Sequence, residues 1–300
     1  MLATSKQLPS LRSASLPEPS VEVDKGQFIL LEAVAQAASA FEIPWLSTGA
    51  GGRVLLLERL LGLPPGRATE DLDFGVMVRS WDKYRALKDR ICEDGRFHAD
   101  PTQSQRLWCG EDAKLDLVPF GTIALPDGTI HWPSEEGVAM TVLGFQEAYD
   151  AAVRIMVNQR LAVPVATAPA MLLLKIIAWE ARHVTSPGRD ASDIAYILHY
   201  GEKIIGQDSF YEEYAEITEA VDWDLTLASA RVFGMQIARL AQPRTRNHLL
   251  EILNREISEG EESMLVREVA AGVGTGSNPP TAALILLQQV TAGLAGKETT

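Results

Sequence analysis

The sequence predicts an α+β protein, in which a mixed β-sheet flanked by helices is followed by an all-helical C-terminal part. Up to about residue 166, apolar residues occur both in short strand-like runs and at helical spacing. From residue 167 onward, the apolar stretches have helical spacing and none is typical of a strand. We therefore expect a Pro/Ser-rich, poorly ordered leader at 1–22, a mixed α/β domain at 23–166 and a helical domain at 167–300.

The individual elements follow from local patterns in chain order. Pro44 ends the first amphipathic helix, and Ser80 fits the N-cap of another. Gly110–Asp112 and Asn158–Gln159 fit the turns of two hairpins. A short strand that runs into a glycine turn is expected within 45–52. Further strands are expected at 71–78, 104–110, 113–121 and 137–145 and as a pair within 154–166. The expected helices lie at 25–43, 53–63, 80–95, 167–183, 190–200, 224–240, 244–257 and in the last segment.

The composition excludes several classes of protein. The 27 Lys and Arg residues against 40 Asp and Glu give a formal net charge of −13. That charge disfavours broad binding along a nucleic-acid backbone, although it leaves RNA docking at a local basic patch open. The sequence has no apolar run long enough to span a bilayer, and residues 1–20 lack the apolar core of a secretory signal. With only Cys92 and Cys109, we expect a cytoplasmic protein with reduced thiols.

Two aspartates on a predicted strand raise the functional question. In the run "DLDFGVMV", Asp71 and Asp73 point to one face of the strand, and Leu72 and Phe74 point to the other. Neighbouring carboxylates repel each other unless a positive group lies between them, and carboxylate oxygens suit Mg²⁺. Solvated carboxylates on a strand surface would give the same spacing, so this pattern alone leaves both interpretations open.

A third aspartate and a glycine turn favour the metal interpretation. In "KLDLVPF" the leucines take the core side, which leaves Lys114 and Asp116 on the other face. If the two strands are neighbours, three carboxylates meet and can hold two metal ions. Upstream, "TGAGGRVLLL" is a glycine turn at the start of a helix, where backbone amides and the helix dipole favour phosphate oxygens.

These motifs, in this order, resemble a known family. "TGAGGRVLLLERLLGLPPGRATEDLDFGV", followed by "LDLVPFG", is similar to the nucleotidyltransferase superfamily of the DNA polymerase β type. It resembles more closely the AbiEii/AbiGii abortive-infection toxin-like nucleotidyltransferases. "MLLLKIIAWEARHVTSPGRDASDIAYILHY" is similar to the segment of that family in which a Lys is followed by an Arg and then by D-x-x-D. The resemblance runs from about residue 40 to residue 200.

The resemblance implies a Mg²⁺-dependent enzyme that transfers a nucleoside monophosphate from an NTP to an acceptor hydroxyl and releases pyrophosphate. It assigns Asp71, Asp73 and Asp116 as the Mg²⁺ ligands, with Asp116 nearest the acceptor, where it lowers the barrier to deprotonation. It also implies that the helical domain completes the nucleotide cleft.

The glycine turn departs from the family pattern. Gly49 and Ala50 stand where the family has Gly-Gly or Gly-Ser, so backbone amides, with Ser47 or Thr48, must replace a missing hydroxyl. Arg67 fits either a phosphate contact or a pair with Glu70. The residues that the resemblance assigns to nucleotide binding in this region are Gly49, Ala50, Gly51, Gly52, Arg53 and Arg67.

A second group of candidates lies in the predicted helical domain. Lys175 interrupts the run "LLLKIIAW", where burial of an ammonium without a partner is costly. Helical spacing puts Lys175, Trp179 and Arg182 on one face, and the resemblance implies that Lys175 and Arg182 contact the triphosphate. It places Asp190 and Asp193 in the same site, orienting Lys175 or an arginine. The structural alternatives are a snorkelling lysine, an N-cap at Asp190 and a surface ion pair at Asp193.

The acceptor is the point on which the sequence leaves alternatives. The toxin-like resemblance implies RNA, such as the end of a tRNA, with a cognate antitoxin as partner and no membrane. The acidic balance favours a small-molecule or protein hydroxyl instead. Two further alternatives are a non-catalytic nucleotide-binding module of the same fold and a phosphoesterase that uses the same carboxylates.

Overall fold

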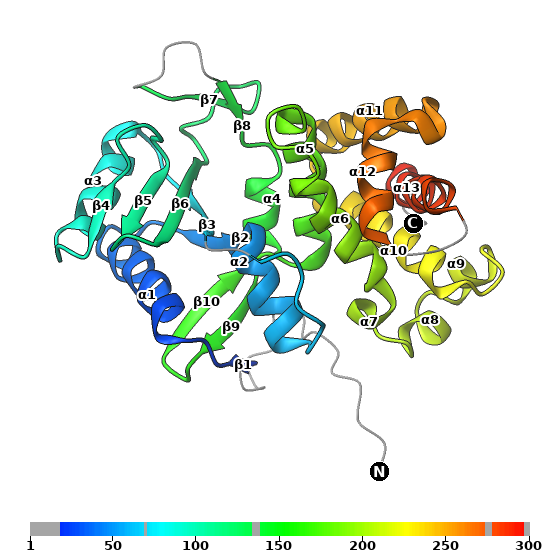
Figure 1. Ribbon diagram of the computed structural model, residues 1–300, viewed down its shortest axis with the longest axis horizontal. Helices are drawn as coiled ribbons and strands as arrows, with labels where there is room; N and C mark the ends of the chain where they lie inside the picture. Colours follow the sequence, from blue (N-terminus) through cyan, green and yellow to red (C-terminus); the bar gives the residue numbers. More distant parts are fainter. Residues whose placement is uncertain (1–18, 69–70, 134–138, 274–277, 297–300) are drawn as a thin grey trace. The chain divides into compact units, whose positions relative to one another are not determined.

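The computed structural model describes residues 19–68, 71–133, 139–273 and 278–296 (Figure 1). These residues form two compact units, which adjoin in the sequence between Thr167 and Ala168. The first unit contains a mixed β-sheet with its helices, and the described residues of the second form helices and no strand. The predicted α+β fold class is therefore confirmed, whereas the functions expected of the two domains stay predictions.

The strands of the first unit form two sheets in the part of the chain that is described. They are β1 (Ser20–Val21), β2 (Trp45–Thr48), β3 (Asp71–Met77), β4 (Phe97–Ala99), β5 (Arg106–Cys109), β6 (Ala113–Phe120), β7 (Thr129–His131), β8 (Ala139–Thr141), β9 (Val153–Val157) and β10 (Leu161–Val165). The larger sheet has the order β1-β9-β10-β2-β3-β6-β5-β4, and β7 pairs with β8 alone. The β3–β6 pair at its centre is parallel, whereas β2–β3 and β5–β6 are antiparallel.

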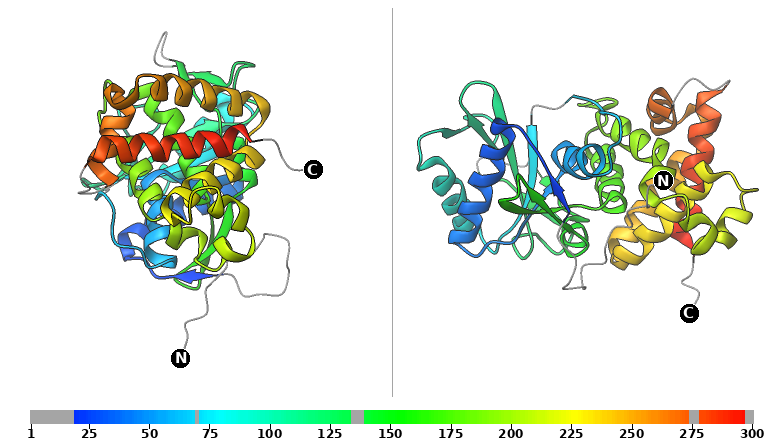
Figure 2. Two further views of the ribbon diagram at one scale, coloured as in Figure 1. Left: turned by 90° about the vertical axis from the view of Figure 1, so that its right-hand side faces the viewer. Right: turned by 90° about the horizontal axis from the view of Figure 1, so that it is seen from below.

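Helices cover the sheet in the first unit and make up the second. In the first unit they are α1 (Lys25–Ala40), α2 (Gly49–Arg53) with its π-helical continuation η1 (Val54–Leu60), α3 (Trp81–Cys92) and α4 (Phe145–Asp150). Helices α1 and α3 lie on the same face of the sheet (Figure 2). The second unit contains α5 (Ala168–Arg182), α6 (Arg189–His199), α7 (Gly201–Ile205), α8 (Ser209–Glu212), α9 (Ala215–Glu219), α10 (Leu225–Leu240), α11 (Pro243–Ser258), η2 (Gly260–Glu262), α12 (Met264–Val273) and α13 (Pro279–Ala295). Across the described ranges, none of the helices has both the length and the apolarity that a membrane crossing requires.

Local sequence signals account for several of these boundaries. The Ser80 hydroxyl caps α3 by accepting from the Lys83 amide at 3.3 Å, as the sequence predicts. Asn158 and Gln159 have φ values of 48° and 55° and lie in the three-residue turn, 158–160, between β9 and β10. Two consecutive positive φ values match the twist of the paired strands, so this hairpin is also confirmed.

The N-terminal boundary differs from the prediction. Ser20 and Val21 form β1, which pairs in parallel with β9, although the sequence places both residues in a disordered leader. The Val21 side chain is buried, and the Met156 amide donates to the Pro19 carbonyl at 2.8 Å. A single buried apolar residue and edge pairing therefore order this segment, a signal too short for periodicity to reveal. Residues 1–18 lie outside the described part of the chain.

Helices α10 and α13 approach each other at glycines. A Cβ atom on Gly234 would lie 2.0 Å from the Val290 carbonyl oxygen, and one on Gly293 would lie 2.0 Å from the Arg231 carbonyl oxygen. We expect Gly234→Ala to lower the free energy of unfolding by about 1–3 kcal/mol, because the helices must move apart. Urea denaturation measures this. Gly26→Ala in α1 is the matched control, since its nearest neighbour is the flexible Asp24 carboxylate at 3.2 Å; an equal loss in both variants would contradict the prediction.

Candidate functional site

Three aspartates of the first unit lie on one face of the sheet. Strands β3 and β6 pair in parallel with Asp73 directly opposite Asp116 and with Asp71 opposite Lys114. Residues opposite each other in paired strands share a face, and residues two apart on one strand do so too. The structure thus brings together the carboxylates of Asp71, Asp73 and Asp116.

Two cations of the same sheet offset these carboxylates. Arg106 on β5 donates from Nε to Asp116 Oδ1 and from Nη2 to Asp116 Oδ2, both at 2.8 Å. The same Nη2 lies 3.7 Å from Asp71 Oδ2, and Lys114 Nζ lies 3.5 Å from Asp71 Oδ1. The hydrogen bonds to Asp116 raise the pKa of Arg106. A guanidinium and an ammonium therefore balance the repulsion that the sequence argument assigned to a divalent cation.

Arg106 is not among the residues that the sequence motifs indicate, although the sequence contains a signal for its pairing. The predicted hairpin turns at Gly110–Asp112, and the observed register places Cys109 opposite Ala113. Counting three residues back along one strand and three forward along the other places Arg106 opposite Asp116. Pairing an arginine with a carboxylate across a hairpin is a strong interaction, because the planar guanidinium fits a carboxylate in two places.

The three carboxylates fit Mg²⁺ by their chemistry and their register. Mg²⁺ prefers hard oxygen ligands such as carboxylates, and here they come from two neighbouring strands. In the described ranges, however, no group of three His, Cys, Asp or Glu side chains is arranged to hold a metal as placed. Asp71 and Asp116 contact Arg106 instead. The three carboxylates are thus suited to Mg²⁺, but in this structure Arg106 and Lys114 offset their negative charge. The assignment of the carboxylates as metal ligands stays a prediction.

The glycine turn lies against this carboxylate face. Strand β2 leads directly into α2, and Gly49 at the junction has a φ of 58°. A Cβ atom at Gly49 would lie 2.0 Å from Asp73 Oδ2, so this position requires glycine both for its backbone conformation and for space. Ala50, Gly51 and Gly52 follow it and are buried. The turn that the sequence assigned to phosphate binding therefore adjoins Asp73.

Ser47 cannot provide the hydroxyl expected of it. Its side chain is fully buried, and its Oγ is 3.6 Å from the point where a Cβ on Gly51 would lie. The alternation of β2 turns Ser47 toward the opposite face from Thr48, which pairs with Asp73. This corrects the expectation that Ser47 replaces the missing hydroxyl of the turn.

The two arginines near the turn have different surroundings. Arg53 is buried, forms an ion pair with Glu58, and donates from Nη2 to the Arg67 carbonyl at 2.7 Å. These contacts join the helix to the loop before β3. Arg67 is exposed and donates to the Ala68 carbonyl at 3.4 Å. Its expected partner Glu70 lies outside the described residues, and the phosphate contacts of both arginines stay predictions.

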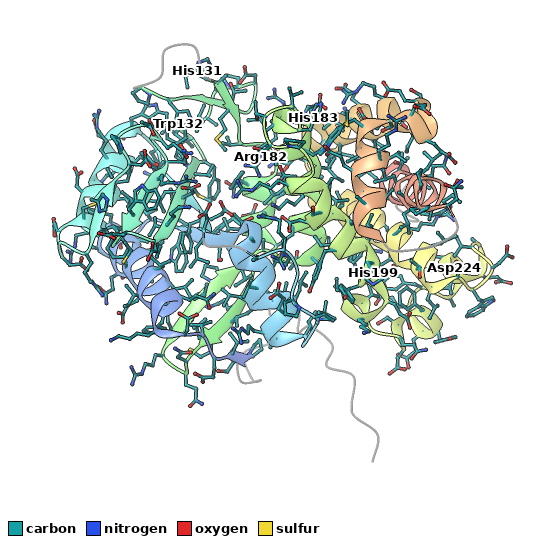
Figure 3. All side chains as sticks on the ribbon, viewed as in Figure 1. His131, Trp132, Arg182, His183, His199 and Asp224 are labelled. Carbon is teal, nitrogen blue, oxygen red and sulfur yellow. The ribbon has the colours of Figure 1, made fainter. Side chains whose placement is uncertain are left out.

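The second group of candidates forms a buried charge network in the helical unit. Lys175 Nζ lies 2.6 Å from Asp193 Oδ2 and 3.0 Å from Asp190 Oδ1. Arg182, at the end of α5 (Figure 3), donates from Nε and Nη2 to the two Asp190 oxygens at 2.6 and 2.7 Å. Lys175, Asp190 and Asp193 are all buried, so α5 and α6 are joined by paired charges.

This network excludes the structural alternatives for these residues. Lys175 does not snorkel to solvent, because its ammonium lies between two buried carboxylates. Gly188 is the N-cap of α6, and Asp190 lies in its first turn. Asp193 is buried and pairs with Lys175 rather than with a surface arginine. The expected arrangement, in which the two aspartates orient Lys175, is present, and its contact with a triphosphate stays a prediction.

Protonation of Asp190 should lower the free energy of unfolding in acid. Burial acts to raise the pKa of Asp190, but hydrogen bonds from Arg182 and the charge of Lys175 outweigh it and lower the pKa to about 2. Because this value is below that of the unfolded chain, the stabilisation is present above about pH 4 and is lost as the pH falls through 2. A shift of this size corresponds to about 2 kcal/mol. Urea unfolding between about pH 5 and about pH 2 should show a smaller acid loss in Asp190→Asn, and equal losses would contradict the assignment.

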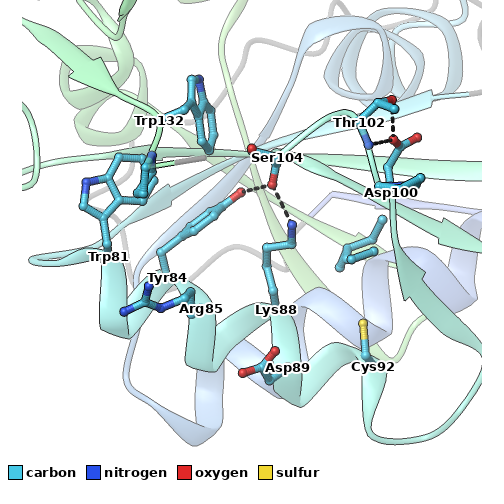
Figure 4. A pocket seen from close by; sticks show the side chains of 14 residues that line it. Trp81, Tyr84, Arg85, Lys88, Asp89, Cys92, Asp100, Thr102, Ser104 and Trp132 are labelled. Carbon is cyan, nitrogen blue, oxygen red and sulfur yellow. Dashed lines mark hydrogen bonds between the residues drawn. The ribbon is translucent and has the colours of Figure 1, made fainter. Parts of the chain in front are cut away.

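A cavity in the first unit is lined by residues other than Asp71, Asp73 and Asp116. It has a volume of about 430 Å³ and lies between α3 and the segment 99–104 (Figure 4). At its edge, Lys88 Nζ donates to the Ser104 carbonyl at 2.6 Å. Leu107 lines the cavity, and because side chains alternate along β5, Arg106 leaves the opposite face of the sheet.

Comparisons with known proteins find similar solved structures but no matching family. No family model matches the sequence, and no curated protein matches it. One similar structure is the solution structure of the antibiotic-resistance factor ANT(2'')-Ia, with 15% identity, a TM-score of 0.36, and coverage of 67% of this chain and 99% of that chain. The crystal structure of the same factor with adenylyl-2''-tobramycin has 14% identity, a TM-score of 0.37, and coverage of 69% and 98%. An antigenic nucleotidyltransferase-like protein from Paracoccidioides brasiliensis has 16% identity, a TM-score of 0.40, and coverage of 70% and 94%. With identities and TM-scores this low, the site assignment rests on the contacts described above.

Proposed function

We propose that the protein is a Mg²⁺-dependent nucleotidyltransferase that transfers a nucleoside monophosphate from an NTP to an acceptor hydroxyl and releases pyrophosphate. The observation that carries this proposal is the in-register pair of Asp73 and Asp116, with Asp71 on the same face and Gly49 against Asp73. Three carboxylates gather on this face although two cations, Arg106 and Lys114, are needed to offset their mutual repulsion. Chemistry at a polyphosphate gives that cluster a use.

Each residue of this group has a defined task in the proposed reaction. Asp71, Asp73 and Asp116 would hold Mg²⁺, which when bound neutralises phosphate charge and stabilises the leaving pyrophosphate. Asp116 is assigned to accept the proton of the acceptor hydroxyl as that oxygen attacks the α-phosphorus. The oxygen–phosphorus bond to the acceptor forms while the bond to the pyrophosphate oxygen breaks. Gly49 brings the turn close enough for its backbone to border the phosphates.

The acceptor divides this proposal into two forms. The toxin-like resemblance favours RNA, with a cognate antitoxin as partner, and the net charge of −13 favours a small molecule or a protein hydroxyl. Purified protein should be incubated with Mg²⁺ and each of the four α-phosphate-labelled NTPs, with and without total tRNA. Label on tRNA supports an RNA acceptor, and label on protein supports a protein acceptor. Growth arrest on expression in a host without an antitoxin would support a toxin, and harmless expression of active enzyme would count against one.

A non-catalytic nucleotide-binding module is the second candidate, and one observation favours it. Arg106 occupies both oxygens of Asp116, the carboxylate expected to serve the acceptor. Nucleotide binding without label transfer to tRNA, protein or small molecules in a cell extract would support this candidate and contradict the transferase.

A further inference from the structure

We propose that Arg106 is a positioning residue that competes with the divalent cation for Asp116 and Asp71, so that the cation loads only when Arg106 is displaced. This inference rests on the proposed function, since it takes the three aspartates as the cation ligands. It adds a residue and a loading step that the proposed reaction does not require.

The geometry places the guanidinium where it offsets both carboxylates. Arg106 makes two hydrogen bonds of 2.8 Å to Asp116, and its Nη2 is 3.7 Å from Asp71 Oδ2. The side chains of Arg106, Asp71 and Asp116 are exposed by 14%, 15% and 11%. Their pairing is therefore only partly screened by water, and a two-point arginine–carboxylate contact is among the strongest of ion pairs.

The backbone of Arg106 is fixed by the sheet. Arg106 lies directly opposite Asp116 in the β5–β6 pair. Its amide donates to the Gln103 carbonyl at 3.0 Å, and its carbonyl accepts from the Asp100 amide at 3.1 Å. Only the side chain is therefore free to leave Asp116. Displacement consists of a change of its rotamer, without any rearrangement of the strand.

The charge balance of the site makes the Arg106 guanidinium and the divalent cation alternative partners of the carboxylates. Among these five side chains, Asp71, Asp73 and Asp116 contribute −3, and Arg106 and Lys114 contribute +2, so that their charges sum to −1. A divalent ion added without displacement would have to enter beside the guanidinium and share its oxygens. Displacement instead exposes both Asp116 oxygens and gives the freed guanidinium an incoming anionic triphosphate as a new partner.

This competition has a measurable consequence for metal affinity. A ligand that binds only the minor, Arg106-displaced form has its apparent affinity reduced by the population of that form. Removal of the guanidinium should therefore strengthen binding of the metal alone. We expect Arg106→Gln to bind Mn²⁺ at least about tenfold more tightly than the unaltered protein.

The experiment is titration of free Mn²⁺ by electron paramagnetic resonance on the full chain without nucleotide. Arg96→Gln is the matched control, because Arg96 pairs with Asp94 at the surface and should leave the Mn²⁺ affinity unchanged. Arg106→Lys retains the charge but loses the two-point contact, so it should bind Mn²⁺ with intermediate affinity and remains informative if Arg106→Gln fails to fold. Affinity in the Arg106 variants equal to or weaker than that of the unaltered protein would overturn the proposal.

Asp73→Asn separates this proposal from the proposed function. If Asp73→Asn abolishes Mn²⁺ binding while the Arg106 variants leave it unchanged, the metal site stands and the competition is wrong. If Mn²⁺ binding survives Asp73→Asn unaltered, the assignment of the metal site fails, and the competition fails with it.

Discussion

Asp73→Asn should reduce nucleotidyl transfer by about 100- to 1,000-fold, the range found when one preorganised electrostatic partner is removed from an active site. Asp73 lies opposite Asp116 in the sheet and against Gly49 of the turn, so it adjoins both a second carboxylate and the glycine turn of the proposed site. Asparagine keeps the shape of the side chain and loses its charge. The rate of label transfer from an α-phosphate-labelled NTP measures the effect.

Asp112→Asn is the matched control for this variant. This substitution removes the same charge as Asp73→Asn does, but at an exposed position in the turn between β5 and β6. We expect its transfer rate to stay within about twofold of the unaltered rate, since surface changes away from a site have small effects. Transfer by a folded Asp73→Asn protein at the rate of Asp112→Asn would remove Asp73 from the reaction.

Lys175→Met should lower the free energy of unfolding by about 3–5 kcal/mol, because it removes one partner of a buried charge network. Lys175 lies between Asp190 and Asp193, both of which are buried. Methionine fills a similar volume but leaves Asp193 without the ion pair at 2.6 Å. Urea denaturation followed by circular dichroism measures the loss.

Two further variants test whether paired charge is the cause. Lys203→Met removes an exposed ammonium from the same helical unit and should change stability by about 0.5 kcal/mol or less. Adding Asp193→Asn to Lys175→Met should recover part of the loss, because it removes the buried negative charge that the Lys175 ammonium faces at 2.6 Å. A Lys175→Met protein as stable as Lys203→Met, or no recovery in the double variant, would show that this network does not stabilise the unit.

The sequence was sufficient for the parts of the site that depend on strand alternation. Period-two patterning put Asp71 and Asp73 on one face, and it put Asp116 on the polar face of its own strand. That β3 and β6 are neighbours was a hypothesis from the chemistry of three carboxylates, and the register supplies it. The buried position of Lys175 likewise implied a buried partner, which the D-x-x-D spacing provides.

The remaining features depend on tertiary contacts that local patterns do not encode. Arg53 begins an apolar helix in sequence, and only the fold shows that it pairs with Glu58 and the Arg67 carbonyl. Ser47 precedes the glycine turn, but strand alternation and the overlying α2 bury its hydroxyl. The pairing of Arg106 with Asp116 depends on the register of the β5–β6 hairpin, residue by residue. Motifs of carboxylates and glycines do not contain that register.

The most direct test of the proposed reaction compares NTP labelled at the α-phosphate with NTP labelled at the γ-phosphate, each with Mg²⁺ and a mixture of tRNA, protein and small molecules. The proposed nucleotidyl transfer predicts that the α-label becomes attached to an acceptor while the γ-label is recovered in pyrophosphate. Recovery of the γ-label on an acceptor would show phosphoryl transfer. Recovery of the γ-label as inorganic phosphate would show hydrolysis, and either result would contradict the assignment of Asp71, Asp73 and Asp116 to nucleotidyl transfer.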